Sequence, residues 1–543
     1  MPDPTERFGE TTLPGDRSVD ETDAPDFTPA SHNKPQNRTA WLDMAVLGFV
    51  TVLIRIPAFL SSKHLTFDDG VFASSIIAMR DGGVPFRDVF SSQGPLFLPL
   101  AYVFDLLGFR TIDSPRVLGV LSGLVITLVT YWCLHMMAGR KSAIFGSLLA
   151  LTSGCLMWVT GPLAADGPAL AFAMITFALA LTYNRRPSLR TAVLMGLAVG
   201  ATLSTKAMEA PILLPVIMVL GAPLLGALRS GTLRARNFLD TVVAALVSAV
   251  LFAAISLPFG FSDVWDQSFR YRTEAASARD PLANAKKIIS TMWDRDLVIY
   301  LFGAATILWG IWTWSQNRST SAELASSPTD DSPVDDSPVE PASISETQWT
   351  PSERSLVISW VVFSALWLVF MVSPMWRPHV SAMIPPLALL LGVFALPRKA
   401  LYVLGVLSLP LLVIQLDGLL APGGYSGSEA RVVAILEELP PGAWALSDEP
   451  GLVWRAGRRT TDNMVDPSML RVQQGRYNVD TLIADATKKQ VCAVVVRSNE
   501  RFGSFPDLAE KLESKGYEVV DTSRNRVGDD QRVYIKTDCD PLS

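Results

Sequence analysis

Long apolar blocks, separated by short polar stretches, run through the chain from Trp41 to Leu416. Each approaches the roughly 17 to 25 residues that a helix needs to cross a bilayer. The blocks are Trp41–Leu60, Val117–Met137, Ser142–Thr160, Pro168–Tyr183, Thr191–Ser204, Pro211–Leu228, Thr241–Phe259, Leu297–Trp314, Leu356–Val372, Val380–Leu396 and Leu401–Leu416. The pattern predicts a polytopic α-helical membrane protein with about eleven transmembrane helices over residues 41–418.

Two long segments interrupt this pattern because they are polar and rich in Pro and Asp: residues 1–40 and residues 315–354. They offer little apolar surface to offset the entropy of ordering, so both are predicted to be disordered. Of 543 residues, only 18% are charged, against about 25% in soluble domains. Much of the acid behind the net charge of −6 lies in these two segments, which gives no reason to expect nucleic acid as a partner.

The basic residues of the short loops predict how the chain crosses the cell membrane. If Trp41–Leu60 is the first span and Val117–Met137 the second, the most basic short loops share one side. These are the loops around Arg140, Arg185, Arg234 and Arg398. By the positive-inside rule that side is the cytoplasm, which places the N-terminus and residues 315–354 there.

The same assignment of spans to the two sides of the membrane defines the outer face. It requires the apolar stretch Gly94–Gly108 to lie along the membrane surface, as a surface helix within a first outer loop over residues 61–115. The turn around Asp166, residues 260–295 and everything after Asp417 then also lie outside.

Residues 424–543 have the composition of a soluble domain and are numerous enough for an independent core. Candidate helices (Glu429–Leu439, Val479–Thr487, Phe505–Lys515) alternate with candidate strands (Ala443–Leu446, Cys492–Val496, Tyr517–Val520, Val533–Lys536). The alternation predicts an extracytoplasmic α/β domain. Cys492 and Cys539 lie in this domain, where a disulfide is allowed, whereas Cys133 and Cys155 lie in spans as packing residues.

The first outer loop contains two adjacent carboxylates, Asp68 and Asp69, directly after the first span. Partial desolvation near the bilayer would raise their proton affinity, which makes them candidate general bases. The alternative is structural, with Asp68 capping a helix that starts near Gly70 and Asp69 favourably placed against its dipole.

Other polar groups gather at the outer ends of the spans. Asp166 ends the third span and Lys206 the fifth, so both could share a cavity with Asp68. A Lys at membrane depth is costly unless it is paired, and a phosphate is a suitable partner. The alternatives for Lys206 are snorkelling to the interface and a local pair with Glu209.

Further cations lie in two other outer regions. Arg377 and His379 precede Pro385-Pro386, although Arg377 could equally be an interfacial anchor. Arg270 and Arg272 could attract a phosphate headgroup or form a solvated face. There is no glycine-rich phosphate loop and no metal-spaced His/Cys cluster in the sequence, which disfavours nucleotide triphosphate chemistry and a structural zinc.

The order of these motifs resembles the lipid-carrier-dependent GT-C glycosyltransferases, closest to the branch with protein O-mannosyltransferases and the aminoarabinose transferase of lipid A. The resemblance covers roughly Trp41–Leu396. It rests on Asp68-Asp69, Gln93-Gly94-Pro95-Leu96, Asp166, Thr205-Lys206, and Pro378-His379 running into Ile384-Pro385-Pro386-Leu387. The stretches Ser447–Pro450 and Ala456–Arg459 look like the outer domain of actinobacterial members.

The resemblance implies an inverting transfer of a sugar from a polyprenyl-phosphate carrier to an acceptor hydroxyl of a glycan, lipid or protein. Asp68 matches the catalytic carboxylate, with Asp69 beside it, although the family usually has Asp-Glu there. Asp166 and Gln93 match positions near the acceptor or a divalent metal, although a cation or His is common near Gln93. Lys206 and Arg377 match donor-phosphate ligands, and His379 the His or Tyr before the paired prolines.

No ATP or redox cofactor is expected for such a transfer, because the phosphate already activates the sugar. A transporter or lipid flippase would also have many spans, but would concentrate its polar residues at mid-membrane, often in broken helices. A membrane scaffold with a partner-binding outer domain would leave the shared placement of Asp68, Lys206 and His379 unexplained.

Overall fold

The structure is a computed structural model that describes residues 34–230, 235–275, 280–326, 352–394, 396–524, 528–539 and 541. The chain divides into two compact units, residues 1–42 and 43–543. Most of the two segments predicted to be disordered lies outside the described residues. Of the remainder, residues 34–40 begin helix α1 (Lys34–Leu53), residues 315–326 continue helix α14 (Pro281–Ser326), and residues 353–354 begin the helix Glu353–Phe370, so these parts are helical.

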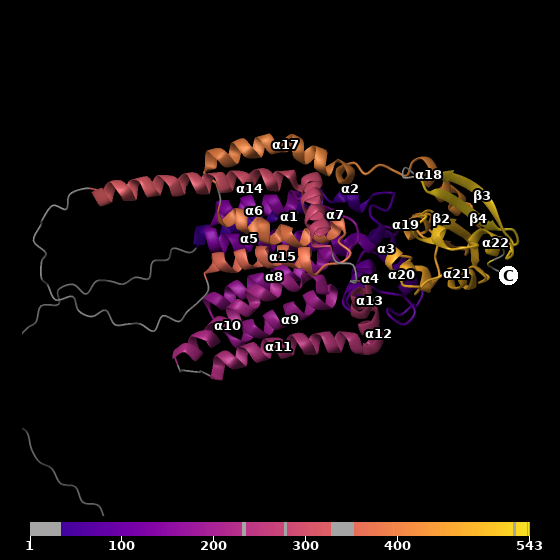
Figure 1. Ribbon diagram of the computed structural model, residues 1–543, viewed down its shortest axis with the longest axis horizontal. Helices are drawn as coiled ribbons and strands as arrows, with labels where there is room; N and C mark the ends of the chain where they lie inside the picture. The colour runs from indigo at the N-terminus through magenta and orange to yellow at the C-terminus, as the bar shows by residue number, and fades with distance from the viewer. Residues whose placement is uncertain are drawn as a thin grey trace, which may run out of the picture. The chain divides into compact units, whose positions relative to one another are not determined.

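Helices account for the membrane part of the chain (Figure 1). In order they are α1, α2 (Ile56–Phe59), α5 (Val117–Ala138), α6 (Arg140–Thr152), α7 (Gly154–Thr160), α8 (Asp166–Arg185), α9 (Leu189–Thr205), η2 (Ala207–Ile212), α10 (Leu213–Ser230), α11 (Ala235–Ser256), η3 (Leu257–Phe259), α12 (Phe261–Trp265), η4 (Asp266–Arg270), α13 (Tyr271–Ala275), α14, α15 (Glu353–Phe370), η5 (Arg377–Met383), α16 (Ile384–Val393) and α17 (Arg398–Leu420).

Seven described helices are long and apolar enough to cross a membrane, or eight if the α6–α7 pair, bent by 62°, counts as one span. The sequence predicted about eleven. The difference comes from three blocks that form shorter elements: α9, the stretch 207–222, and α16 with η5. Two of these blocks hold internal prolines, at Pro211 and at Pro385-Pro386, which interrupt or start helices because proline lacks the N–H donor.

Residues 61–115, which were predicted to form the first outer loop, fold into α3 (Phe67–Arg80), α4 (Phe97–Leu107) and η1 (Ser114–Arg116). At 11 residues, α4 is about 17 Å long, roughly half of a bilayer core, so it cannot cross. Its one charged residue, Asp105, is buried and pairs with Arg80 at 2.6 Å, which fixes α4 against α3. The length of α4 thus agrees with the prediction that residues 94–108 do not cross, and their position along the membrane surface stays a prediction.

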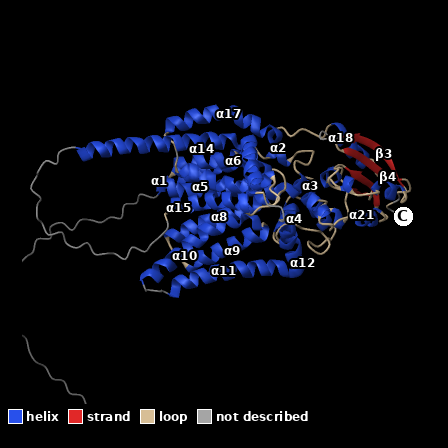
Figure 2. Ribbon diagram, in the orientation of Figure 1, coloured by secondary structure: helices blue, strands red, loops and turns tan. Residues whose placement is uncertain are grey.

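The C-terminal domain holds the strands of the described chain's one named sheet (Figure 2). Its elements are α18 (Gly427–Glu437), β1 (Trp444–Ser447), α19 (Pro450–Arg455), η6 (Asp462–Met464), α20 (Met469–Gln473), α21 (Val479–Ala486), β2 (Val491–Val496), η7 (Phe502–Ser504), α22 (Leu508–Glu513), β3 (Tyr517–Arg524) and β4 (Asp530–Lys536). The strand order is β1-β2-β4-β3, with β1 parallel to β2 and the other pairs antiparallel. Each predicted helix and strand of this domain is present within a few residues.

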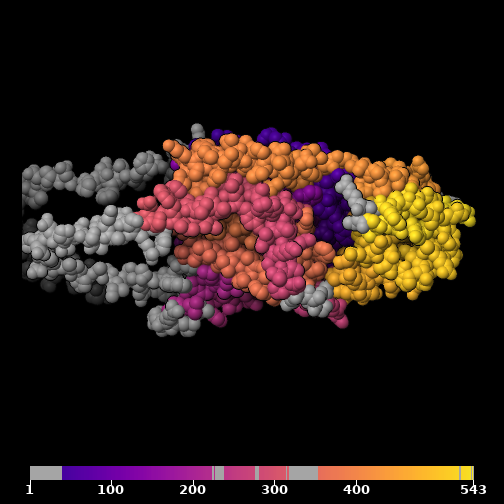
Figure 3. Space-filling view, turned by 45° about the horizontal axis from the view of Figure 1, so that its top comes forward, coloured from indigo at the N-terminus to yellow at the C-terminus, as the bar shows by residue number. Residues whose placement is uncertain are grey.

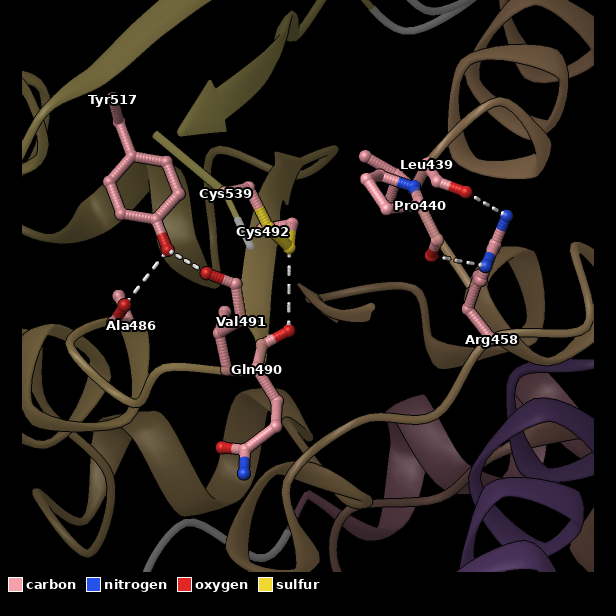
Figure 4. Close-up of a disulfide and its surroundings, with 9 residues drawn as sticks. All are labelled: Leu439, Pro440, Arg458, Ala486, Gln490, Val491, Cys492, Tyr517 and Cys539. Carbon is pink, nitrogen blue, oxygen red and sulfur yellow. Dashed lines mark hydrogen bonds between the residues drawn. A yellow bond between two sulfur atoms is a disulfide. The ribbon is translucent and has the colours of Figure 1, made fainter. Parts of the chain in front are cut away.

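Cys492 on β2 forms a disulfide with Cys539, which ties the end of the chain to the sheet (Figure 4). In the same view the Tyr517 hydroxyl lies 2.8 Å from the carbonyl oxygen of Ala486 and 2.8 Å from that of Val491, which share its proton. This contact links β3 to the end of α21 and the start of β2. Arg458 donates to the carbonyls of Leu439 and Pro440, which follow α18. The arginine of the Ala456–Arg459 motif therefore anchors α18 to the rest of the domain.

The C-terminal domain docks on α3 through α19. In the space-filling view, indigo atoms of the early chain lie between the helices and the yellow C-terminal domain (Figure 3). At the contact a Cβ on Gly70 would lie 2.4 Å from the Gly451 nitrogen, so two glycines let the backbones touch. Ser74 donates to the Pro450 carbonyl at 3.3 Å, and Arg455 pairs with Asp113 at 2.7 Å.

We expect Gly70→Ala to weaken this docking, because the added methyl meets backbone atoms that cannot rotate away. Overpacking of this kind costs about 1–3 kcal/mol, which would lower the midpoint of thermal unfolding in detergent. Gly303→Ala is the control, because a Cβ there meets nothing within 4 Å among the described atoms. Equal midpoints for the two variants would contradict the close contact.

Candidate functional site

The site is built around a buried ion pair between Arg116 and Asp69, both with side chains 0% exposed. The guanidinium contacts both carboxylate oxygens, at 3.0 and 2.5 Å. Its remaining N–H groups donate to carbonyls at the end of the first span, those of Ala58 and Phe59, and to carbonyls just after it, those of Ser61 and Lys63. Asp69 also accepts from the backbone N–H groups of Leu65 and Leu163. The first span, α3 and the chain before Asp166 are thus joined at one point.

These partners decide between the two adjacent carboxylates. Both carboxylate oxygens of Asp69 already accept hydrogen bonds, and Arg116 and the two backbone donors hold the pKa of Asp69 below the usual value despite its burial. Asp69 is therefore suited to positioning α3 and not to accepting a proton.

Asp68 has the opposite surroundings. Helix α3 starts at Phe67, and its N-cap is Thr66, whose hydroxyl accepts from the Asp69 N–H at 3.1 Å. The predicted alternative, in which Asp68 is the cap, is wrong because Asp68 lies inside the first turn. Its carboxylate accepts no hydrogen bond from any residue that the structure describes, and its side chain is half-buried.

Burial raises the pKa of Asp68 to about 6. Lys206 and Arg272 act to lower this pKa, whereas Asp166 and Asp466 raise it further. A carboxylate with a pKa near 6 is a stronger base than an ordinary aspartate and is still ionised at neutral pH. Asp68, unlike Asp69, is therefore a carboxylate that is free to accept a proton.

Lys206 and Asp166 meet at the ends of two neighbouring helices. Asp166 begins α8, Lys206 follows α9, and the Lys206 Nζ lies 2.7 Å from an Asp166 carboxylate oxygen, although the approach angle is not that of a hydrogen bond. Lys206 is 5% exposed, so it neither snorkels nor forms the local Glu209 pair that the spacing offered. The cation is held at the end of the bundle by a carboxylate 40 residues earlier.

The Gln93-Gly94 loop lies against the same helix end. The Gly94 and Leu96 N–H groups donate to the carbonyls of Thr205 and Ser204, at 3.1 and 2.9 Å. Only glycine fits at position 94, because a Cβ would lie 2.2 Å from the Ser204 carbonyl oxygen. Gln93 is buried beside Lys206, and its side-chain oxygen has no hydrogen-bond partner among the described residues.

A cavity of about 1210 Å³ opens at Lys206. Its polar lining includes Lys206, Arg272, Gln93 and Ser268. Most of its wall is apolar and comes from α9, α10 and α11: Val199, Leu203, Val216, Ile217, Leu220, Ala245, Ala249 and Phe252. The cavity is therefore a mostly apolar space whose lining includes two cations, Lys206 and Arg272.

Three predicted site residues lie differently. Arg270 is exposed, pairs with Glu274 at 2.8 Å, and does not line this cavity. Arg377 also lies away from the lining and pairs with Asp294 at 3.1 Å. His379 is buried, and its pKa is held well below the usual value by burial and by the nearby cations Lys206 and Arg272. None of these three residues lines the cavity, although His379 is close enough to Lys206 and Arg272 for their charges to lower its pKa.

Among the described residues, no three His, Cys, Asp or Glu side chains are grouped to hold a metal ion. A divalent ion at Asp166, which the family resemblance allows, would need further ligands from substrate or water.

Arg116 and Asp466 are the residues that sequence reasoning missed. Arg116 stands at the start of an apolar block, where a span-end anchor is the ordinary interpretation. Asp466 lies in the C-terminal domain, hundreds of residues from Asp68, and no spacing connects them. The one available signal for Arg116 was that it immediately precedes a long apolar block.

No protein-family model matches the sequence, and no curated protein matches it. Solved structures do match the fold. ArnT from Cupriavidus metallidurans in the apo state has a TM-score of 0.55 at 14% identity, covering 92% of this chain and 98% of that one. The same protein bound to undecaprenyl phosphate gives 0.54 at 14% identity, covering 91% and 98%.

The Archaeoglobus fulgidus oligosaccharyltransferase complex with Zn and sulfate gives a TM-score of 0.48 at 12% identity, covering 90% of this chain and 72% of that one. At these identities the likeness to ArnT shows the fold alone. The chain therefore shares the fold of ArnT, with a helical membrane part followed by a C-terminal domain, and that arrangement was predicted from the sequence.

We expect Asp69→Asn and Asp68→Asn to differ sharply in stability. Removing one partner of a buried ion pair costs about 3–5 kcal/mol, so Asp69→Asn should lower the thermal unfolding midpoint strongly. Asp68→Asn removes no ion pair and no hydrogen bond, so its midpoint should stay near that of the wild type. Comparable losses in both variants would contradict the division of roles.

Proposed function

We propose that the chain is an inverting glycosyltransferase that moves a sugar from a polyprenyl-phosphate carrier to an acceptor hydroxyl at the outer face of the cell membrane. The cavity at Lys206 carries the proposal. Its apolar wall suits a prenyl chain, and the cations at its polar end suit a phosphate. The likeness to ArnT, which has been solved with undecaprenyl phosphate, supports a carrier of this class.

The chemistry follows from the groups at that end. Asp68 accepts the proton of the acceptor hydroxyl while the oxygen of that hydroxyl forms a bond to the anomeric carbon. The bond from that carbon to the phosphate oxygen breaks, and the electron pair leaves with the phosphate. Lys206 and Arg272 stabilise the charge that grows there. Attack opposite the leaving phosphate inverts the anomeric carbon.

The outer location is supported by the ends of the helices. Asp166 begins α8 and Lys206 follows α9, whereas Arg185 ends α8 and Arg190 lies in the first turn of α9. Site residues and basic loop residues thus occupy opposite ends of both helices. Because basic short loops face the cytoplasm, the site and the C-terminal domain face outward.

A thiol-labelling experiment tests this orientation. In intact cells, Ser514→Cys in the C-terminal domain should react with a membrane-impermeant reagent. Arg186→Cys, between α8 and α9, should react only after permeabilisation. Both positions are exposed, so access to the reagent depends on the side of the membrane. Labelling of Arg186→Cys in intact cells would reverse the orientation.

We expect Asp68→Asn to abolish transfer in folded protein, because the amide cannot accept the proton. In the wild type the rate should fall as pH drops through about 6, since burial raises the Asp68 pKa to that value. With an aspartate of ordinary pKa as the base, the rate would stay constant until the pH fell to about 4. Turnover by Asp68→Asn near that of the wild type would remove Asp68 as the base.

Two arginines on one segment give a matched test of donor binding. Arg272→Gln should weaken donor binding or slow phosphate departure by about ten- to 150-fold, the worth of one charge-assisted hydrogen bond. Lys206→Gln should act similarly, whereas Arg270→Gln should leave the donor dependence unchanged because Arg270 does not line the cavity. The measurement is initial rate against donor concentration. Equal effects of the Arg270 and Arg272 variants would point to a general charge effect and against a phosphate site.

A further inference from the structure

One segment of the C-terminal domain, Asp462–Arg476, contacts both outer regions that carry the site. Val465 is fully buried in a core formed by the first outer loop and the residues before Asp166, including Phe72 and Leu163. The Arg471 guanidinium lies 4.3 Å from the centroid of the Phe90 ring. The segment is therefore packed into the loop that carries Asp68.

The same segment holds the chain that carries Arg272. The Tyr271 and Ser468 hydroxyls lie 3.0 Å apart, and Gln474 donates to the Tyr271 carbonyl at 2.9 Å. Arg476 pairs with Asp266 at 2.6 Å. Asp462–Arg476 thus connects the base side of the site to its phosphate side.

Asp466 lies between these two attachments, immediately after Val465 and two residues before Ser468. It is 4% exposed, and one carboxylate oxygen accepts the Ser468 N–H at 3.1 Å. Among the described residues no Lys or Arg nitrogen lies within ion-pair distance of the Asp466 carboxylate, although Arg471 donates to the Asp466 backbone carbonyl at 3.2 Å and the charges of Arg471 and Arg501 act on Asp466 from farther away. Asp485, another buried acid of this domain, does form an ion pair, with Lys488 at 2.6 Å. The charge of Asp466 reaches both sides of the site: after burial, it contributes to the raised pKa of Tyr271, and it also raises that of Asp68.

We propose that Asp466 is an acceptor-binding residue supplied by the C-terminal domain, and that the acceptor is a sugar with a second hydroxyl beside the attacking one. The inference rests on the proposed transferase activity. A carboxylate accepts hydrogen bonds and donates none, so it recognises hydroxyl or ammonium groups. Asp68 accepts the proton of the attacking hydroxyl. Asp466, whose carboxylate has no ion-pair partner, can accept a hydrogen bond from a neighbouring hydroxyl of the same acceptor. A single Ser or Thr hydroxyl of a peptide would leave Asp466 unused.

The test compares Asp466→Asn with Asp485→Asn in the full-length protein. Asn at position 466 keeps an oxygen for the Ser468 N–H, so the segment should stay docked and the thermal unfolding midpoint should change little. With an undecaprenyl-phosphate sugar as donor and alkyl glycosides as acceptors, Asp466→Asn should raise the acceptor KM roughly tenfold while the donor KM stays constant. Asp485→Asn should change neither.

Two further readouts separate binding from structure. With a deoxy glycoside that lacks the hydroxyl next to the attacking one, wild type and Asp466→Asn should have the same acceptor KM. The pH at which the rate is half-maximal should also fall in Asp466→Asn, because one negative charge near Asp68 is lost while Lys206, Arg272 and Asp166 remain.

The outcomes are distinguishable. A wild-type protein that consumes no polyprenyl-phosphate sugar overturns the proposed function, and this inference with it. If the wild type is active and Asp466→Asn keeps the same acceptor KM, the role of Asp466 alone is overturned. Transfer by the wild type to a Ser/Thr peptide as well as to a glycoside would also overturn that role. A lowered unfolding midpoint with an unchanged acceptor KM per folded molecule would assign Asp466 to structure.

Discussion

The ion pair of Arg116 and Asp69 is the constraint on which the site depends. A guanidinium buried at the start of α5 is tolerated because each of its N–H groups meets a carboxylate or a backbone carbonyl. The cost of desolvating both charges is offset only while every partner is present. Because the carbonyls come from the end of the first span, the pair sets where that span stops and where α3 begins. The position of Asp68, the next residue to Asp69, follows from it.

The second requirement is a polar end to an apolar bundle. The Lys206 ammonium lies 2.7 Å from an Asp166 carboxylate oxygen, and this opposite charge offsets part of the cost of burying a cation at the end of α9. The Gln93-Gly94 loop closes over this end, and the cavity continues into the apolar space between α9, α10 and α11. The charged side chains therefore lie where the helices end, and the rest of the cavity wall is apolar. The C-terminal domain packs against the loop that carries Asp68, through the Gly70–Gly451 contact and residues 462–476.

Much of this could be predicted from the sequence, because the signals were local. Apolar blocks gave the helices, alternating patterns gave the C-terminal sheet domain, and the grouping of Asp68, Asp166 and Lys206 followed from the ends of predicted spans. The division of labour between Asp68 and Asp69 could not be predicted, because the two neighbours differ only in partners that lie 47 and 94 residues away. Arg270 and Arg377 were equivalent to Arg272 as charges, and only packing shows which of them faces the cavity. The actinobacterial likeness of residues 447–459 stays a prediction, although the structure gives these residues a docking role.

The most direct test of the account is an experimental structure of the protein with undecaprenyl phosphate bound. If Lys206 and Arg272 bind the donor, the phosphate should lie about 3 Å from the Lys206 ammonium and the Arg272 guanidinium. The prenyl chain should then lie between α9, α10 and α11, and the Asp68 carboxylate should stay accessible to the acceptor. A phosphate beside Arg377 or Arg270, with the cavity at Lys206 empty of lipid, would contradict it.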